Sequence, residues 1–168
     1  DEDNFTTLHD KLSELASVML EEVLPLIENG YVQATEQNES LATRTAKITN
    51  RDLVLDWELP AAHVRNQIRA YSLEPGAFSL LRGRPVKVLS AKIASQTANG
   101  RPGSIGGILK KVGFTVNCQD LQLLIKQVKP AGKKAMDAWA FQIGARLTEN
   151  DSFSSAQDIS PNKSQEES

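Results

Sequence analysis

Between residues 53 and 128 the chain is divided into short apolar or alternating runs, each bounded by turn-forming residues. Alternation of apolar and polar side chains is typical of a half-buried β-strand. Five or six such runs at regular spacing predict a mainly β fold, a small closed or Greek-key barrel. The runs are LVLDW (53–57), PGAFSLL (75–81), VKVLSAKI (86–93), SIGGIL (104–109), FTVNC (114–118) and LQLLIKQV (121–128).

Two helices are expected to accompany these strands. Residues 59–71 have apolar side chains at helical spacing, with Pro60 in the first turn, where proline is favourable. A closing helix is expected to carry Met136, Ala140, Phe141 and Gly144 on one side. The predicted barrel domain therefore spans 51–148, with one inserted and one C-terminal helix. The tail that follows, 149–168, is rich in Ser, Gln, Asn and Glu, which predicts acidic disorder.

The N-terminal part has a different pattern. Residues 5–28 combine an apolar stripe at helical spacing with an acidic opposite face, which predicts an amphipathic helix within an N-terminal segment 1–30. Pro25 is expected to kink or restart it, because proline has no N–H for the helical ladder. The stripe is wide enough to require a sheet or a second helix to cover it. Residues 31–50 are mostly polar without a period and predict a linker.

Charge is distributed unevenly along the chain. The net charge is −8 over residues 1–45, +10 over residues 46–148 and −4 over residues 149–168, although the whole chain carries only −2. A basic middle of this size indicates an anionic partner, and nucleic acid is the usual one. The alternative is that the two acidic ends fold over the basic middle and screen it.

The cations of the middle gather at predicted turns and strand ends, where a small barrel contacts a nucleic-acid backbone. Few aromatic residues lie among them, so recognition of a folded RNA by shape and phosphates is favoured over base stacking. For Lys133 and Lys134 the alternative is that they only begin and solubilise the last helix. The predicted contact residues are Arg65, Arg69, Arg82, Arg84, Lys87, Lys110, Lys111, Lys126, Lys129, Lys133 and Lys134.

No catalytic or metal-binding constellation is apparent in the sequence. His9 and His63 each lie alone on a predicted helix, without the spaced partners of a metal site. The carboxylates around Trp57 have the spacing of turn and cap residues. Cys118, the single cysteine, lies in an alternating run and is expected to be buried, in a chain suited to a reducing compartment. The chain therefore looks like a binding module.

Several of these motifs, in this order, resemble the C-terminal part of methionyl-tRNA formyltransferases. They are Asp56-Trp57, Ile68-Arg69-Ala70, Pro75-Gly76-Ala77 and the closing Pro130-Ala131-Gly132-Lys133-Lys134 followed by Met136. The stretch 5–30 resembles the last helices of the family's catalytic domain. Two departures are Gln119-Asp120-Leu121, where the family has turn glycines, and Leu73-Glu74, where a second proline or an aromatic residue is common.

The resemblance implies an enzyme that transfers a formyl group from 10-formyltetrahydrofolate to methionyl initiator tRNA in translation initiation, without a metal, in the bacterial cytoplasm or an organelle. It implies a barrel similar to the oligonucleotide-binding fold, preceded by a helical remnant of a Rossmann-like domain. The catalytic Asn, His and Asp of the family belong to the N-terminal domain, so this chain is expected to be an inactive fragment of a longer protein, with no catalytic residues of its own and no membrane partner.

Two alternatives remain open at the level of sequence. One is the C-terminal part of another folate-dependent formyltransferase, acting on a nucleotide sugar or releasing formate. The other is a stand-alone oligonucleotide-binding module with an acidic regulatory helix. The helix expected at 5–28 discriminates between them, because a native regulator packs on the barrel whereas a displaced piece of a larger domain exposes its apolar stripe.

Overall fold

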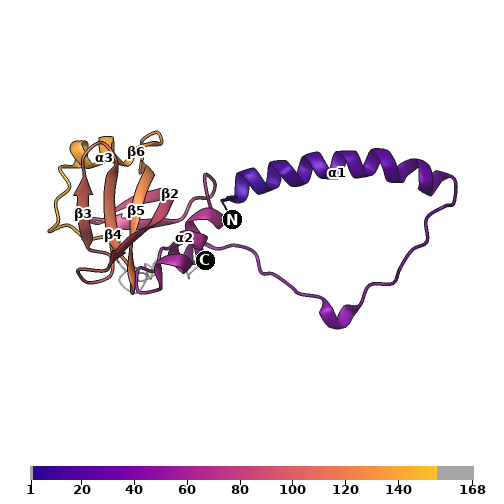
Figure 1. Cartoon of the computed structure of the whole chain (residues 1–168), viewed down its shortest axis with the longest axis horizontal. Helices are drawn as coiled ribbons and strands as arrows, with labels where there is room; N and C mark the ends of the chain where they lie inside the picture. The colour runs from indigo at the N-terminus through magenta and orange to yellow at the C-terminus, as the bar shows by residue number, and fades with distance from the viewer. Residues whose placement is uncertain (1, 155–168) are drawn as a thin grey trace, which may run out of the picture. The chain divides into compact units, whose positions relative to one another are not determined.

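The computed structural model describes residues 2–154, and its contacts divide the chain into two compact units, Asp1–Thr49 and Asn50–Ser168. Each unit is described by itself (Figure 1). None of the helices in the described part of the chain has the length and apolar character that a bilayer-spanning segment requires.

The first unit contains one long helix, α1 (Phe5–Glu28), and a short 3-10 turn, η1 (Glu39–Leu41). Asn4 caps α1, because its side chain accepts a hydrogen bond from the backbone N–H of Thr7 while the Thr7 hydroxyl accepts one from Asn4. The helix continues through Pro25 to Glu28, so the predicted restart is wrong, whereas the predicted kink stays a prediction.

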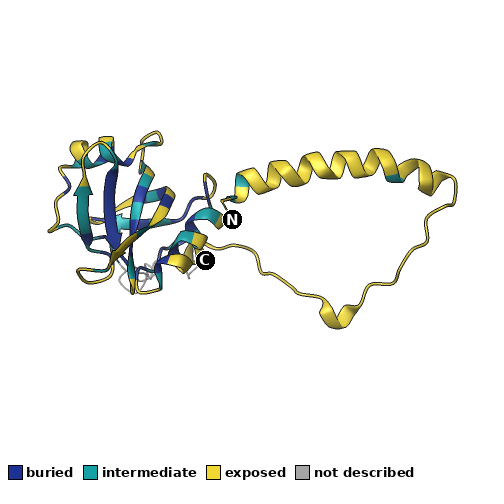
Figure 2. Ribbon diagram, in the orientation of Figure 1, coloured by how far each residue is buried: buried dark blue, intermediate teal, exposed yellow. Residues whose placement is uncertain are grey.

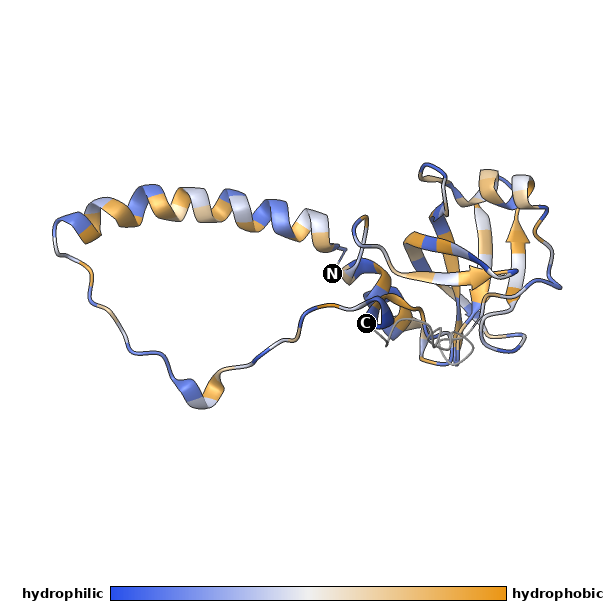
Figure 3. Cartoon of the chain, turned by 180° about the vertical axis from the view of Figure 1, so that it is seen from behind, coloured by the Kyte–Doolittle hydropathy of each residue, from blue (hydrophilic) through white to orange (hydrophobic). Residues whose placement is uncertain are grey.

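No residue of α1 is buried (Figure 2). Apolar and polar side chains are interspersed along the helix, as expected for an apolar stripe at helical spacing (Figure 3). Its apolar residues are each about half exposed, and the residues of the predicted linker are exposed throughout. An apolar stripe of this length without cover is unusual for a surface helix.

The second unit is built on an antiparallel sheet, which confirms the predicted mainly β class. Its strands follow the order β1-β2-β5-β4-β3, and β6 pairs with β5. Register shifts between β2 and β5, near Ser90 and Ala91, let the long strand β2 curl around the core. The strands are β1 (Phe78–Leu81), β2 (Arg84–Thr97), β3 (Ile105–Leu109), β4 (Gly113–Asn117), β5 (Leu121–Pro130) and β6 (Met136–Asp137).

The sheet does not close on itself, because its edge strands β1 and β3 do not pair directly. Residues 151–154 lie between these two edges. The N–H of Phe153 donates to the Gly103 carbonyl (2.8 Å), the N–H of Ser154 donates to that of Leu80 (2.8 Å), and the N–H of Ile105 donates to that of Asp151 (3.1 Å). This segment therefore bridges the gap that the strands leave in the barrel.

The bridge corrects the prediction of disorder from residue 149 onward. Phe153 is only 3% exposed and lies against Trp57 and Phe114, with ring centroids 5.7 and 6.2 Å away. The segment is ordered because it satisfies backbone groups on both edges of the sheet and fills the core, neither of which its polar composition reveals. The remainder of the predicted tail, 155–168, lies outside the described residues.

Two helices and a 3-10 turn, η2 (Asn50–Leu53), cover the barrel. Helix α2 (Ala61–Ala70) packs mainly on β2, and helix α3 (Ala138–Ala145) packs on β4 and β5. The predicted first strand, 53–57, is wrong: the chain there leaves η2 and makes a single parallel bridge from Val54 to Phe78. Trp57 is fully buried in that stretch, and its indole N–H donates to the Ser79 hydroxyl (3.2 Å).

Candidate nucleic-acid interface

The turn between β5 and β6 presents two of the predicted cations. The N–H of Lys133 donates to the Pro130 carbonyl (3.0 Å), and Gly132 occupies the turn at φ +71°, which glycine adopts without strain. Lys133 and Lys134 are both exposed. Helix α3 begins only at Ala138, where the Asp137 carboxylate caps it. The alternative that these lysines begin the last helix is therefore wrong.

The pairing of β2 with β5 places Lys87 directly opposite Lys129. Glu74 reaches both ammonium groups, at 3.6 Å from Lys87 and 3.3 Å from Lys129. The hydrogen bond from Lys129, with the charge of Lys87, lowers the pKa of Glu74 below its usual value. The aliphatic stem of Lys87 passes over Gly76, since a Cβ built on Gly76 would lie 2.8 Å from Lys87 Cδ.

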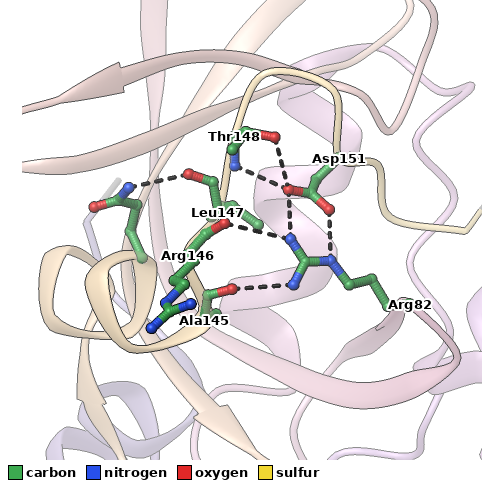
Figure 4. Close-up of polar contacts among 7 residues, drawn as sticks. Arg82, Ala145, Arg146, Leu147, Thr148 and Asp151 are labelled. Atoms are coloured by element: carbon green, nitrogen blue, oxygen red, sulfur yellow. Dashed lines mark hydrogen bonds and ion pairs between the residues drawn. The ribbon is translucent and has the colours of Figure 1, made fainter.

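Arg82, in the β1–β2 turn, is fully engaged by the protein itself (Figure 4). Its Nε and Nη2 donate to the two carboxylate oxygens of Asp151 (2.6 and 2.7 Å), and Nη1 donates to the Ala145 carbonyl (3.0 Å). The hydrogen bonds from Arg82 lower the pKa of Asp151 to about 2. Because its donors are occupied, Arg82 is a clamp between the hairpin, α3 and the closing segment, and we leave it out of the interface.

Six of the predicted cations have charged groups without a hydrogen bond or ion pair to residues 2–154. Arg84 lies beside the Arg82 turn, and Lys110 and Lys111 form the β3–β4 turn. This turn adjoins the start of α3, because a Cβ on Gly113 would lie 3.3 Å from that of Ala138. The six are Arg84, Lys110, Lys111, Lys126, Lys133 and Lys134.

Lys126 has no partner on β2, because Ser90 pairs with Gln127 and Ala91 with Ile125. It therefore sits at a bulge one residue beyond the strand position that faces β4. Arg65 and Arg69 form a separate group on α2. The first turn of α2 is held by Asp120, which accepts from the N–H of Ala61 (2.8 Å) at the opposite end of β4 from Lys110 and Lys111.

The hairpin, the β5–β6 turn and α3 together enclose a groove of about 550 Å³. Its apolar lining includes Val86, Met136 and Phe141, and Arg84 and Lys133 belong to its rim. The sequence placed Met136, Ala140, Phe141 and Gly144 on one side of the closing helix. Ala140, Phe141 and Gly144 of α3 do line this groove together, whereas Met136 lines it from β6, before the helix begins. The acidic partners Glu74 and Asp151 were not recognised from sequence, because nothing local links them to Lys87, Lys129 or Arg82.

No candidate for nucleophilic or metal chemistry emerges from residues 2–154. Burial raises the pKa of the Cys118 thiol to about 12, which suits the predicted core residue rather than a nucleophile. Asp56 accepts from the N–H of Glu58 (3.1 Å), as a turn residue does. Throughout the same residues, His, Cys, Asp and Glu side chains form no group of three or more that would hold a metal ion.

The second unit is a small antiparallel barrel that carries six cations with no partner among residues 2–154, at turns, a strand end and a bulge. Residues 47–146 match the family described as "Formyl transferase, C-terminal domain", and the chain belongs to that family. Similar proteins include the methionyl-tRNA formyltransferases of Bacillus licheniformis (36% identity over 86% of this chain and 46% of the relative) and Dictyoglomus turgidum (36%, 90% and 49%). The chain thus spans about half the length of these curated relatives.

Among solved structures, a variant of HypX from Aquifex aeolicus is similar with a TM-score of 0.65 at 18% identity, covering 83% of this chain and 26% of that protein. Another HypX structure, solved in complex with tetrahydrofolic acid, gives a TM-score of 0.58 at 20% identity, covering 73% and 22%. At this level of identity the likeness concerns the fold alone.

Proposed function

We propose that this chain is the tRNA-binding portion of a methionyl-tRNA formyltransferase. In this proposal the barrel holds initiator methionyl-tRNA by its phosphates while a catalytic domain, which precedes residue 1 in the relatives, transfers the formyl group to the methionyl amine. The observation that carries the proposal is a set of six cations without partners among residues 2–154, at turns, a strand end and a bulge of a barrel of this family. A bacterial cytoplasm or an organelle is the compartment in which such an enzyme acts.

We assign no binding site in this chain to 10-formyltetrahydrofolate, the formyl donor that the family implies. A pterin ring presents N–H donors along one edge, which carboxylates or carbonyls accept. The groove beside α3 has Arg84 and Lys133 at its rim and no carboxylate in its lining. These residues do not fit the donor, and we derive no catalytic step through it.

The proposal is tested by the anisotropy of labelled initiator tRNA titrated with the whole chain across a salt series. We expect log affinity to fall linearly with log salt, because each lysine or arginine on a phosphate releases counterions. Lys133→Glu with Lys134→Glu should weaken binding and reduce the slope by about two, with little effect on thermal stability because both side chains are exposed.

The matched control is Arg44→Glu with Lys47→Glu, which makes the same change of charge in the first unit and should alter binding far less. Equal binding by the Lys133/Lys134 double variant and the parent chain would remove this face from the interface. If tRNA does not bind even at low salt, the chain would instead belong to another folate-dependent formyltransferase. The similarity of its fold to that of HypX is compatible with this alternative.

A further inference from the structure

The groove beside α3 has the shape and chemistry of a nucleotide site. Its volume of about 550 Å³ lies within the usual range for small-molecule pockets. Pro85 and Val86 line one side and Pro130 and Ala131 the adjoining edge, tied together where the N–H of Ala131 donates to the Pro85 carbonyl (3.0 Å). Ala140, Phe141 and Gly144 of α3 form the facing wall.

The width of this groove is fixed by the clamp at its end. Arg82 leaves the hairpin on one side and donates to the Ala145 carbonyl at the end of α3 on the other, while Asp151 holds its guanidinium from the closing segment (Figure 4). Arg82 thus links the hairpin directly to the end of α3, in addition to the packing of α3 on β4 and β5. A groove whose walls are held apart in this way is preformed, which lowers the entropy cost of binding.

Small residues keep the groove open. Gly144 has an ordinary helical backbone, and a Cβ built on it meets no other atom within 4 Å. Gly144 lies one residue before the end of α3, where its right-handed backbone gives no conformational reason for glycine and alanine has the higher helix propensity. Gly144 and Ala140 line the groove together with the apolar side chains of Met136 and Phe141.

The rim supplies charge complementary to a phosphate. Arg84 lies next to Pro85 on the hairpin and Lys133 in the β5–β6 turn, both in the groove lining, and their charged groups have no partner among residues 2–154. An apolar slot with two such cations at its mouth suits a ring that carries an anionic group, as a nucleotide does, better than a wholly apolar ligand.

We propose that this groove binds a single unpaired nucleotide of the RNA, with the base against Met136 and Phe141 and its phosphate at Arg84 and Lys133. This inference rests on the proposed function, since it gives the barrel one contact with a base in addition to its phosphate contacts. The inference differs from the expectation, drawn from the scarcity of aromatic residues, that recognition of RNA by shape and phosphates is favoured over base stacking.

The test uses the whole chain, with adenosine 5′-monophosphate as the probe and inorganic phosphate as its matched anion. NMR titration should shift the Met136 methyl and the Gly144 amide with the nucleotide and not with phosphate. Gly144→Leu, which fills the groove and leaves every charge in place, should weaken nucleotide binding by about tenfold, as expected for loss of one stacked base. Gly144→Ala also raises the helix propensity, but it adds only one methyl group to the groove. This variant should therefore bind the nucleotide nearly as the parent chain does.

The same variants separate this inference from the proposed function. Gly144→Leu should also weaken tRNA binding while leaving its salt slope unchanged, whereas Arg84→Ala should reduce that slope by about one. If the nucleotide shifts no groove resonance, or phosphate alone reproduces its shifts, the nucleotide site is overturned even where tRNA still binds; an apolar peptide segment then becomes the occupant to test. Nucleotide binding in the groove without any tRNA binding would support the site and contradict the proposed function.

Discussion

Asp151 is held by more hydrogen bonds than its place in a polar tail suggests. Besides Arg82, both the N–H and the hydroxyl of Thr148 donate to its Oδ2, at 2.9 and 3.1 Å. These bonds depress the pKa of the folded carboxyl to about 2. A depressed folded pKa means that stability is fully present above the ordinary pKa of aspartate and is lost as the pH falls toward 2.

We therefore expect Asp151→Asn to lower the free energy of unfolding at pH 7 by about 1 kcal/mol, a value kept small because Arg82 is largely exposed to solvent. The loss of stability of the parent chain between pH 4 and pH 2 should become shallower in this variant. Urea unfolding at pH 7, 4 and 2.5 measures both effects. Glu149→Gln, at an exposed neighbour, is the control; if it matches Asp151→Asn at every pH, the clamp contributes nothing.

Glu74 leads to a prediction of opposite sign, because it neutralises Lys87 and Lys129, two predicted contact residues that are not among the six cations without a partner. Removing its charge in Glu74→Gln should release Lys87 and Lys129 for phosphates, so that tRNA binding strengthens and its salt slope steepens. Exposed ion pairs contribute little to folding, so the thermal midpoint should hardly change. Anisotropy titrations of Glu74→Gln beside Glu36→Gln, which removes a carboxylate of the first unit, measure the difference. Weaker binding by Glu74→Gln would show that Glu74 orients the lysines instead.

At the scale of elements, the closing segment 151–154 acts through Phe153. Truncating a buried phenylalanine costs about 3–5 kcal/mol, and Phe153 contacts both Trp57 and Phe114 in the centre of the barrel. Phe153→Ala should lower the unfolding free energy by that amount, whereas Ser152→Ala, which keeps the backbone bridge, should change it by less than about 0.5 kcal/mol. Chemical denaturation of the two variants compares them directly, and similar stabilities would mean that residues 151–154 do not close the barrel.

The elements themselves were predicted from local patterns with uneven success. Strands β1 to β5 were found because alternation and turn glycines are local signals that the folded chain keeps, whereas the two-residue β6 was taken for the start of the closing helix. Residues 53–57 look like a strand but lie at the border of the core, where Trp57 packs without a continuous strand partner. The closing segment escaped prediction because its order depends on Leu80 and Gly103, each far away in sequence.

The same reasoning applies to the site. Lysines and arginines at turns can be listed from sequence, because turns are marked by Gly83, Gly113 and Gly132. Which of them are free to bind an anion depends on long-range partners: Asp151 occupies Arg82 across 69 residues, and Glu74 reaches Lys129 across 55. The groove likewise needs α3 and the hairpin to be brought together before it exists.

At the scale of the whole molecule, the chain should compete for tRNA without catalysing formyl transfer. Added to the methionyl-tRNA formyltransferase of Bacillus subtilis, 31% identical over 89% of this chain, it should inhibit formylation by sequestering the initiator tRNA. Inhibition should therefore be relieved by more tRNA and not by more 10-formyltetrahydrofolate, with an inhibition constant equal to the dissociation constant measured by anisotropy. Rates at varied concentrations of each substrate distinguish the two cases.

The Lys133→Glu, Lys134→Glu double variant is the control for this experiment, because it should inhibit in proportion to its weaker tRNA binding. Relief by the formyl donor would instead mean that the chain withdraws folate, which the absence of a carboxylate in the groove lining argues against. Formylation by the isolated chain would overturn the assignment of catalysis to a separate domain.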